Sequence, residues 1–485
     1  MRFSALLVAL ALTGAGLAAP YNSNGASLIE RRQALTGLFN GVNNALAVTA
    51  SGLLDEIGDA LNKGDREKTL DTLQKLKATK KPKNVGEASS ITKKVAKSEP
   101  DNIVEYSARL IANGIVSGST DDILGYAQGL GSVENGNNNQ YGKPSFLHSQ
   151  PTHLIFCRNP DPPKSVFPRA ASCDAPYTVS ENKLRSAIYI PDTFTYGKKL
   201  PVILFPGTGS TGYTAFRGSF IPLLTGVDWA DPVWVNVPEL LLGDAQVNAE
   251  YAAYALNYIA SLSKRSVAII GWSQGNIDTQ WAFKYWPSTR KVTTDHVAIS
   301  ANYKGTVLAN FVDLSGITNT PSVVQQEAGS NFIKTLRSDG GDSGYVPTTS
   351  LYSSFLDEIV QPQEGTGASA YLLDQRNVGV TNAEVQKVCA RKPGGSFYTH
   401  ESMLANPLSF ALAKDALTHE GPGKISRLDL GTVCASSLAP GLGLEDLLIT
   451  ENAIVIAGIS LATYLPKVKQ EPAIKEYALN TAGTC

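Results

Sequence analysis

The stretch VAIIGWSQGNIDTQWAF, residues 267–283, decides the fold of this chain. An apolar run leads into the pentapeptide Gly-Trp-Ser-Gln-Gly at 271–275, and a helical pattern follows directly. The pentapeptide alone is common by chance, but its place between a strand and a helix predicts a sharp turn that exposes the hydroxyl of Ser273. Glycine fits both flanks because a side chain there would collide with the neighbouring strand or helix. The start of the helix also favours negative charge near the serine.

Four more short apolar runs surround this stretch, namely SAIYI at 186–190, PVILF at 201–205, VWVNV at 233–237 and HVAIS at 296–300. Nearly continuous apolar strands separated by helical patterns predict a parallel sheet with helices on both faces. The helical pattern at about 243–263 lies between the third and fourth of the five strands and predicts a right-handed crossover. We therefore expect an α/β fold class for this part of the chain.

The N-terminal third of the chain differs from the rest. Residues 1–18 have the layout of a secretory signal peptide, whose apolar run is too short to cross a bilayer, so we expect a secreted, extracellular protein. Arg31 and Arg32 are similar to a dibasic processing site, which predicts a short pro-segment at 19–32, although an exposed arginine pair without such a role is also common. Leucines at helical intervals predict an α-helical N-terminal region at 33–135, either a propeptide or an accessory domain, followed by a Pro-rich linker at 136–172. The catalytic domain is expected at 173–485.

The composition excludes several classes of protein. With 485 residues, 43% hydrophobic and 18% charged, and a net charge of −1, the chain is typical of a globular protein and carries no field that would attract a nucleic acid. Neither CxxC nor HExxH occurs, so no metal site and no cofactor are predicted. The apolar segment at 444–465 contains three acidic residues, which predicts a buried or lipid-facing amphipathic helix rather than a transmembrane span.

Two other motifs compete with the pentapeptide. Gly-Asp-Ser-Gly at 341–344 is similar to the nucleophile segment of trypsin-like proteases, but Tyr345 follows it and the parallel pattern contradicts an antiparallel double barrel. We interpret Ser343 as part of a polar loop. Gly-Thr-Gly-Ser-Thr-Gly at 207–212 matches a dinucleotide-binding turn, but Pro206 precedes it and no acidic residue ends a strand at the expected distance, Glu239 being too late.

Read together, six segments resemble the Candida antarctica lipase B-like family of fungal lipases in order and spacing: LFPGTGSTG (204–212), GWSQG (271–275), NYKGTVLA (302–309), PSVVQQ (321–326), VPTTSLYS (346–353) and DEIVQP (357–362). The resemblance runs from about Cys173 to Cys485. It implies the α/β-hydrolase fold, a mostly parallel sheet with helices on both faces, with the N-terminal α-helical region outside it. It further implies a secreted serine ester hydrolase, a lipase or carboxylesterase, that cleaves carboxylic esters such as acylglycerols through an acyl-enzyme and contacts a lipid–water interface transiently.

The resemblance assigns Ser273 as the nucleophile, Asp357 as the orienting acid and His400 as the general base, in the chain order of α/β-hydrolases. A serine hydroxyl needs an imidazole to take its proton, and a carboxylate must hold that imidazole in one tautomer. Glu358 is an alternative to Asp357, and His419 is an alternative to His400. The family segments favour Asp357 and His400. The remaining histidines, His148, His153 and His296, precede the acid.

Further roles follow from the same resemblance. Thr208 and Gln274 are expected to form the oxyanion hole through backbone N–H groups, with the Thr208 hydroxyl as a further donor. Trp272 and Gln326 match residues that line the substrate pocket, although plain packing would also explain them. Apolar residues in FVDLSGI at 311–317 are a further candidate pocket lining.

The chain also departs from the family pattern. Asn302 replaces an acidic residue before YKGTV, which removes an ionised group near the pocket rim. Cys389 and Cys434 match a family disulfide. Val233 and Gln470 stand where cysteines are expected, so Cys173 and Cys485 lack their family partners, and pairing with each other or with Cys157 stays open.

The alternatives within this fold are an acyltransferase and a peptidase. A catalytically silent hydrolase fold used as a binding module is the alternative from another class.

Overall fold

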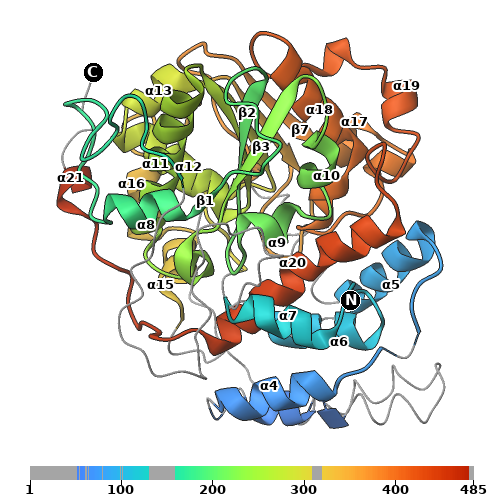
Figure 1. Ribbon diagram of the computed structural model, residues 1–485. Helices are drawn as coiled ribbons and strands as arrows, with labels where there is room; N and C mark the ends of the chain where they lie inside the picture. The colour runs from blue at the N-terminus through green and yellow to red at the C-terminus, as the bar shows by residue number, and fades with distance from the viewer. Residues whose placement is uncertain are drawn as a thin grey trace. The chain divides into compact units, whose positions relative to one another are not determined.

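The computed structural model describes residues 52–129, apart from residues 54, 61, 62, 64, 79, 99 and 101, together with 159–308 and 319–479 (Figure 1). The predicted signal peptide, the pro-segment and the first part of the helical region lie outside the described residues. So do Cys157, Cys485, His148, His153 and the segment FVDLSGI.

A seven-stranded sheet forms the centre of the described structure, in the order β1-β3-β2-β4-β5-β6-β7. Only β1 runs antiparallel, against β3, and every other neighbouring pair is parallel. The strands are β1 (Ile188–Tyr189), β2 (Leu200–Phe205), β3 (Ala230–Val235), β4 (Val267–Trp272), β5 (Thr293–Ile299), β6 (Thr348–Tyr352) and β7 (Val380–Glu384). The predicted mostly parallel α/β-hydrolase fold is confirmed.

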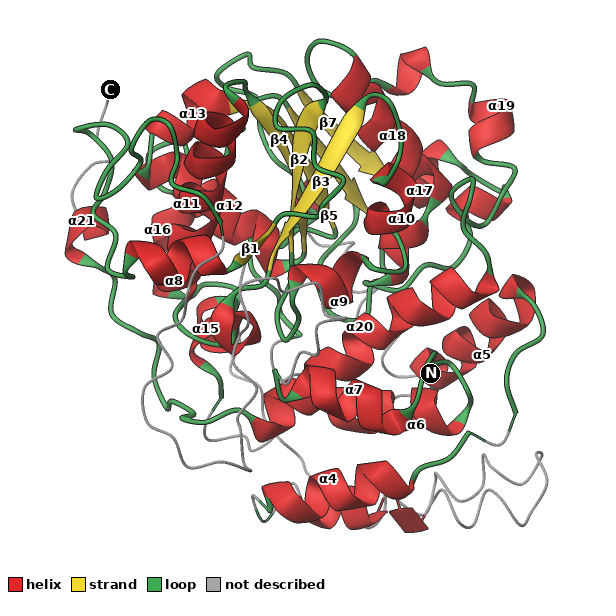
Figure 2. Cartoon of the chain, in the orientation of Figure 1, coloured by secondary structure: helices red, strands yellow, loops and turns green. Residues whose placement is uncertain are grey.

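Helices cover both faces of this sheet (Figure 2). On one face, the apolar side chains of β2 and β4 pack against α11 and α12, and on the other face they pack against α9, α10 and α18. The helices of this part are α8 (Glu181–Ser186), α9 (Gly212–Phe216), α10 (Phe220–Leu224), α11 (Ala245–Ser263), α12 (Gln274–Tyr285), α13 (Ser288–Val292), α15 (Pro321–Gln325), α16 (Asn331–Arg337), α17 (Val385–Val388), α18 (Pro407–Thr418), α19 (Leu430–Val433), α20 (Leu444–Thr463) and α21 (Glu476–Leu479). Short 3-10 turns are η2 (Pro238–Leu241), η3 (Gly365–Gly367), η4 (Pro393–Gly395), η5 (Ser402–Ala405) and η6 (Ile425–Arg427).

The helical N-terminal region contains α4 (Arg66–Lys75), α5 (Val85–Lys97), α6 (Ile103–Ala112) and α7 (Thr120–Ala127) among its described residues. Asparagine or serine side chains cap α5, α6 and α7, which satisfies backbone N–H groups at each start. Helices α6 and α7 lie along α20, and their apolar faces share one core with it (Figure 1). A Cβ atom at Gly458 of α20 would lie 2.4 Å from Oγ of Ser107, so glycine is what permits this close approach.

Helix α20 is the one helix in the described residues that is long and apolar enough to cross a membrane, judged by length and composition alone. In this structure 83% of its most apolar window is buried between the sheet domain and the N-terminal helices. The segment was predicted to be either buried or lipid-facing, and in this structure it is buried.

Candidate active site

Ser273 occupies the predicted sharp turn between β4 and α12. Its backbone has φ 53° and ψ −126°, a left-handed conformation that non-glycine residues rarely adopt. A Cβ at Gly271 would lie 2.3 Å from Oδ1 of Asn276, and one at Gly275 would lie 2.3 Å from the carbonyl oxygen of Pro206. Both glycines of the pentapeptide are thus required by close approach, as predicted.

Asp357 and His400 lie side by side at the same end of the sheet. Nδ1 of His400 lies 2.9 Å from Oδ2 and 3.1 Å from Oδ1 of Asp357. Oδ1 of Asp357 also accepts backbone N–H groups from Ile359 and Val360, at 3.0 and 2.7 Å. Both side chains are buried, and the carboxylate contacts the imidazole on one side and backbone N–H groups on the other. The carboxylate therefore fixes the imidazole through Nδ1, and Nε2 points away from Asp357.

The backbone of His400 is anchored as firmly as its ring. Its carbonyl oxygen accepts from Nε1 of Trp272 at 3.2 Å and from Oγ of Ser300 at 2.9 Å. Its N–H donates to Oε2 of Glu358 at 3.0 Å. Burial disfavours the charged imidazolium, but the charge and hydrogen bond of Asp357 outweigh this effect, so the pKa of His400 is raised above its usual value.

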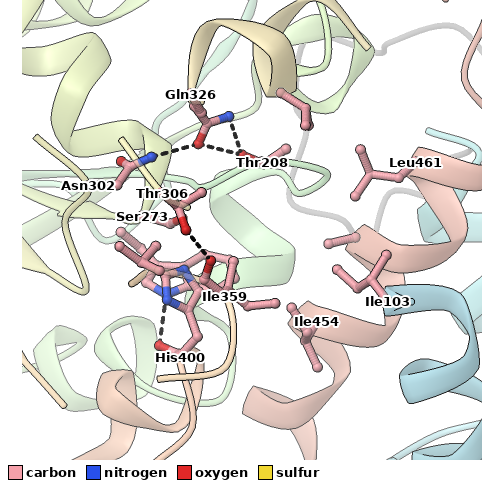
Figure 3. Close-up of a pocket in the computed structure, with 14 residues that line it drawn as sticks. Ile103, Thr208, Ser273, Asn302, Thr306, Gln326, Ile359, His400, Ile454 and Leu461 are labelled. Carbon is pink, nitrogen blue, oxygen red and sulfur yellow. Dashed lines mark hydrogen bonds between the residues drawn. The ribbon is translucent and has the colours of Figure 1, made fainter. Parts of the chain in front are cut away.

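Ser273 and His400 line one pocket, which encloses about 40 Å³ (Figure 3). Within the described residues, the buried Nε2 of His400 has no hydrogen-bond partner, so the serine and the imidazole are not joined by a hydrogen bond here. Figure 3 shows the polar side chains on one side of the pocket, with Ile359 among them, and an apolar side opposite them. The apolar side consists of Ile103 of α6 with Ile454, Ala457 and Leu461 of α20.

The predicted oxyanion residues meet in a compact polar network. The hydroxyl of Thr208 donates to Oε1 of Gln274 at 2.7 Å, and Nε2 of Gln326 lies 3.0 Å from both of those oxygens. Asn302 in turn donates to Oε1 of Gln326 at 2.8 Å. Among the described residues, the backbone N–H groups of Thr208 and Gln274 donate no hydrogen bond, so both remain available to an oxyanion.

A left-handed turn that the sequence did not indicate supports this network. Three consecutive residues of η2, Glu239, Leu240 and Leu241, have φ values of 57°, 55° and 62°. The carbonyl of Leu240 accepts from the N–H of Gly209 at 2.8 Å, and that of Leu241 accepts from Nε2 of Gln274 at 3.2 Å. The strained backbone therefore orients the loop that carries Thr208 and the side chain of Gln274.

The structure separates the other candidates from this site. His296 is buried in β5 against Asn276, and burial lowers its pKa to about 3. His419 is exposed at the end of α18 beside Asp415. Ser343 is buried and donates to the carbonyl of Leu373, away from the pocket, in agreement with its interpretation as a loop residue. Asn302 is fully buried and lines the pocket, rather than standing at an exposed rim.

A disulfide joins Cys389 and Cys434, with 5.3 Å between the Cα atoms. It closes a loop of chain that contains His400, a constraint worth about 4 kcal/mol in the chain-entropy account. Cys173 is also disulfide-bonded. No group of three or more His, Cys, Asp or Glu residues in the described parts of the chain is arranged to hold a metal ion.

Sequence reasoning missed three residues near the pocket. Ile103 lies in the region that the family pattern does not cover, and nothing in its local sequence connects it with a substrate site. Glu401 directly follows His400, and Glu451 interrupts the apolar run of α20. An ionisable residue inside a buried apolar helix was the available signal for Glu451, because such a position is costly without a role.

The chain is similar to two known lipases in sequence or in structure. The chain is 35% identical to lipase B of Pseudozyma antarctica over 289 residues, which cover 57% of this chain and 79% of that protein. The crystal structure of Aspergillus fumigatus lipase B matches with a TM-score of 0.76 and 43% identity, over 88% of this chain and 99% of that one. No protein-family model matches the chain.

Proposed function

The chain belongs to the lipase B family and is a lipase-type carboxylester hydrolase, and from that premise we propose that it cleaves esters through an acyl-enzyme on Ser273. In this proposal Asp357 holds the imidazole of His400, and His400 acts first as base and then as acid. The observation that carries the proposal is the buried pair of Asp357 and His400, whose imidazole lines one pocket with the strained Ser273.

Acylation begins when Nε2 of His400 takes the proton of the Ser273 hydroxyl as its oxygen attacks the ester carbonyl carbon. The imidazolium then gives that proton to the alcohol oxygen, and the carbon–oxygen bond of the alcohol breaks. In deacylation a water molecule attacks the acyl carbon and passes its proton to Nε2. The carboxylic acid leaves and Ser273 regains its proton, so the enzyme is unchanged.

The oxyanion of each tetrahedral intermediate is assigned to the backbone N–H groups of Thr208 and Gln274. Their unused hydrogen-bonding capacity supports this role, because donors already aimed at the site need no reorganisation during the reaction. The Thr208 hydroxyl can act as a third donor only if it turns away from Oε1 of Gln274. That oxygen then still accepts a hydrogen bond from Nε2 of Gln326.

The helical N-terminal region is proposed to be a retained accessory region, because it supplies Ile103 to the pocket and packs closely against Gly458. The match to the Aspergillus fumigatus structure supports this, since 88% of the chain is more than residues 173–485 and the linker provide. N-terminal sequencing of the exported protein tests it: a start near Gln33 is expected, and a start beyond residue 135 contradicts it. Secretion itself belongs to the proposal and is supported by the signal-peptide pattern and the disulfide.

Labelling with a fluorophosphonate probe tests the acyl-enzyme mechanism. Such a probe forms a covalent bond only with an activated serine, so the peptide that contains Ser273 should gain the mass of the probe. The S273A variant should lose the label and all esterase activity, whereas S343A should keep both. A folded native protein in which Ser273 stays unlabelled would exclude the mechanism.

A further inference from the structure

Three glutamates lie together beside the pair of Asp357 and His400. Glu358 follows the predicted acid, Glu401 follows His400, and Glu451 comes from α20. Glu401 and Glu451 are 0% and 3% exposed. Glu358 is partly exposed as a residue, but its Oε1 is buried. Glu401 lies within hydrogen-bonding reach of both other carboxyl groups, so the three form a row from the proposed triad to α20.

In the part of the chain that the structure describes, no lysine or arginine balances the charge of these carboxyl groups. Oε1 of Glu358, both oxygens of Glu401 and Oε2 of Glu451 accept no hydrogen bond from any donor there. Three ionised carboxylates facing one another in a buried space would combine like-charge repulsion with lost hydration, and oxygen would face oxygen without a hydrogen between them.

The surroundings of the row raise the pKa of each of the three carboxyl groups, although the charge of His400 acts on Glu358 in the opposite direction. Burial, followed by the charges of the neighbouring acids, raises the pKa of Glu358 and of Glu401 well above the usual range. Burial raises the pKa of Glu451 to about 7. Besides Asp357 and His400, the ionisable group facing the row is Tyr106 of α6, whose pKa is also raised by burial and then by these acids. Protons on the row remove both the repulsion and the mismatch of acceptors.

We propose that Glu358, Glu401 and Glu451 form a hydrogen-bonded chain of carboxyl groups that share protons at neutral pH, and that Glu358 at its inner end is a positioning residue for His400. The proposal rests on the assigned role of His400 as general base. Glu358 accepts the backbone N–H of His400 through Oε2, and Glu401 keeps the Glu358 side chain in that position. A neutral Glu358 fixes the imidazole without adding a second full charge beside Asp357.

The outer end of the row reaches a second cavity of about 20 Å³, lined by Glu451 and by Ser89 and Thr92 of α5. This volume is sufficient for about one water molecule, and serine and threonine residues lie in its otherwise mixed lining. The cavity shares no lining residue with the substrate pocket, so a proton that reached Glu451 through it would not pass through that pocket.

Infrared difference spectroscopy of the intact protein tests the chain without reference to catalysis. Protonated carboxyl groups have a C=O stretch separate from that of carboxylates. We expect protonated-carboxyl bands from these buried groups at about neutral pH. The share of Glu451, whose pKa is about 7, should decline around that pH, and the rest only in alkaline solution. Part of this signal should be absent from E401Q. The matched control E420Q changes an exposed glutamate and should leave the bands intact. A native spectrum without such bands at neutral pH overturns the proposal even if Ser273 is labelled as expected.

Kinetics test the positioning role. E358Q keeps an oxygen acceptor for the N–H of His400 and the neutral charge that we assign to Glu358, so its acid limb of kcat/KM against pH should coincide with that of the native enzyme. E358L removes the acceptor and should lower kcat about tenfold to a hundredfold with little change in KM, because small misplacements of a catalytic group cost rates of that size. A clear shift of the acid limb to lower pH in E358Q would mean that Glu358 is ionised, which contradicts the shared-proton chain.

Discussion

The two walls of the substrate pocket are built in different ways. The polar wall carries Ser273, Thr208 and Asn302, each just beyond the carboxyl end of a parallel strand, and hydrogen bonds fix nearly every side chain. The apolar wall consists of Ile103, Ile454, Ala457 and Leu461, whose side chains have no polar atoms. The proposed chemistry therefore depends on the sheet, and the shape of the pocket depends on two helices more than 300 residues apart in the chain.

The pocket is also narrow. Its enclosed volume of about 40 Å³ is much smaller than the roughly 150 Å³ of a cavity that holds benzene. Side chains or helices on the apolar wall must therefore move to admit an acyl chain, since the polar wall is tied down by hydrogen bonds. The contrast predicts that changes on the polar wall affect rate constants, whereas changes on the apolar wall affect substrate preference.

The largest expected effect is that of D357N. The amide cannot stabilise the imidazolium and favours the wrong tautomer of His400, so kcat should fall on the order of 10⁴-fold, as for the same change in a serine protease. The substitution D192N, at an exposed aspartate, is the matched control and should leave kcat unchanged. A loss of less than tenfold in D357N would remove Asp357 from the proposed mechanism.

The residual activity of D357N should also have a shifted pH profile. The reaction needs neutral imidazole, so kcat/KM declines as the pH falls through the pKa of His400, which lies above the usual value of 6.5. Burial alone would lower this pKa, and removal of the Asp357 charge leaves burial dominant. The acid limb of D357N should move to lower pH, and an unmoved limb would show that another charge controls His400.

The next effect is that of T208V on the polar wall. Valine keeps the backbone N–H and the shape of threonine but removes the hydroxyl donor, and kcat should fall about 10²-fold to 10³-fold, on the order of 3 kcal/mol. KM should change little, because the hydroxyl acts mainly on the oxyanion. T225V, at an exposed threonine, is the control. If T208V raises KM and leaves kcat intact, the hydroxyl contacts the substrate rather than the transition state.

A third prediction concerns stability where the two regions meet. Glu451 has a usual pKa of 4.5 and one of about 7 in the folded protein. Between these values the folded state keeps a proton that the unfolded state has released, so the free energy of unfolding decreases as the pH rises through this window and levels off above it. The decrease attributable to Glu451 is on the order of 3 kcal/mol.

E451Q removes this titration while keeping the size of the side chain. Urea midpoints measured at about pH 5 and about pH 8 should therefore differ less in E451Q than in the native protein. E420Q should retain the native difference, because Glu420 is exposed. Equal differences in E451Q and the native protein would place the pH dependence elsewhere.

The sequence predicts the polar wall of the pocket better than the apolar wall. The strand runs around residues 201–205 and 267–271 and the turn at Ser273 could be predicted, because burial on both faces and a tight turn leave local patterns. The hydrophobic pattern did not predict strands β6 and β7, because TTSLY and VTNAE mix polar with apolar residues. The family resemblance includes a segment that contains β6, but none that contains β7. The apolar wall could not be predicted, because packing of α6 on α20 leaves only ordinary amphipathic patterns in each helix.

The smallest expected effect is that of I103A, and it tests the apolar wall most directly. Ile103 is buried and lines the pocket from α6, so its removal should enlarge the space for the substrate and shift the ratio of kcat/KM for bulky over short acyl esters about tenfold. The change also leaves a cavity, and loss of stability alone can alter activity. I123A provides the matched control, because Ile123 is equally buried in α7 but does not line the pocket. We expect I123A to lose a similar amount of stability and to keep the native ester ratio. An equal shift of the ester ratio in both variants would mean that the helical region affects the pocket through its general packing rather than through the wall that Ile103 forms.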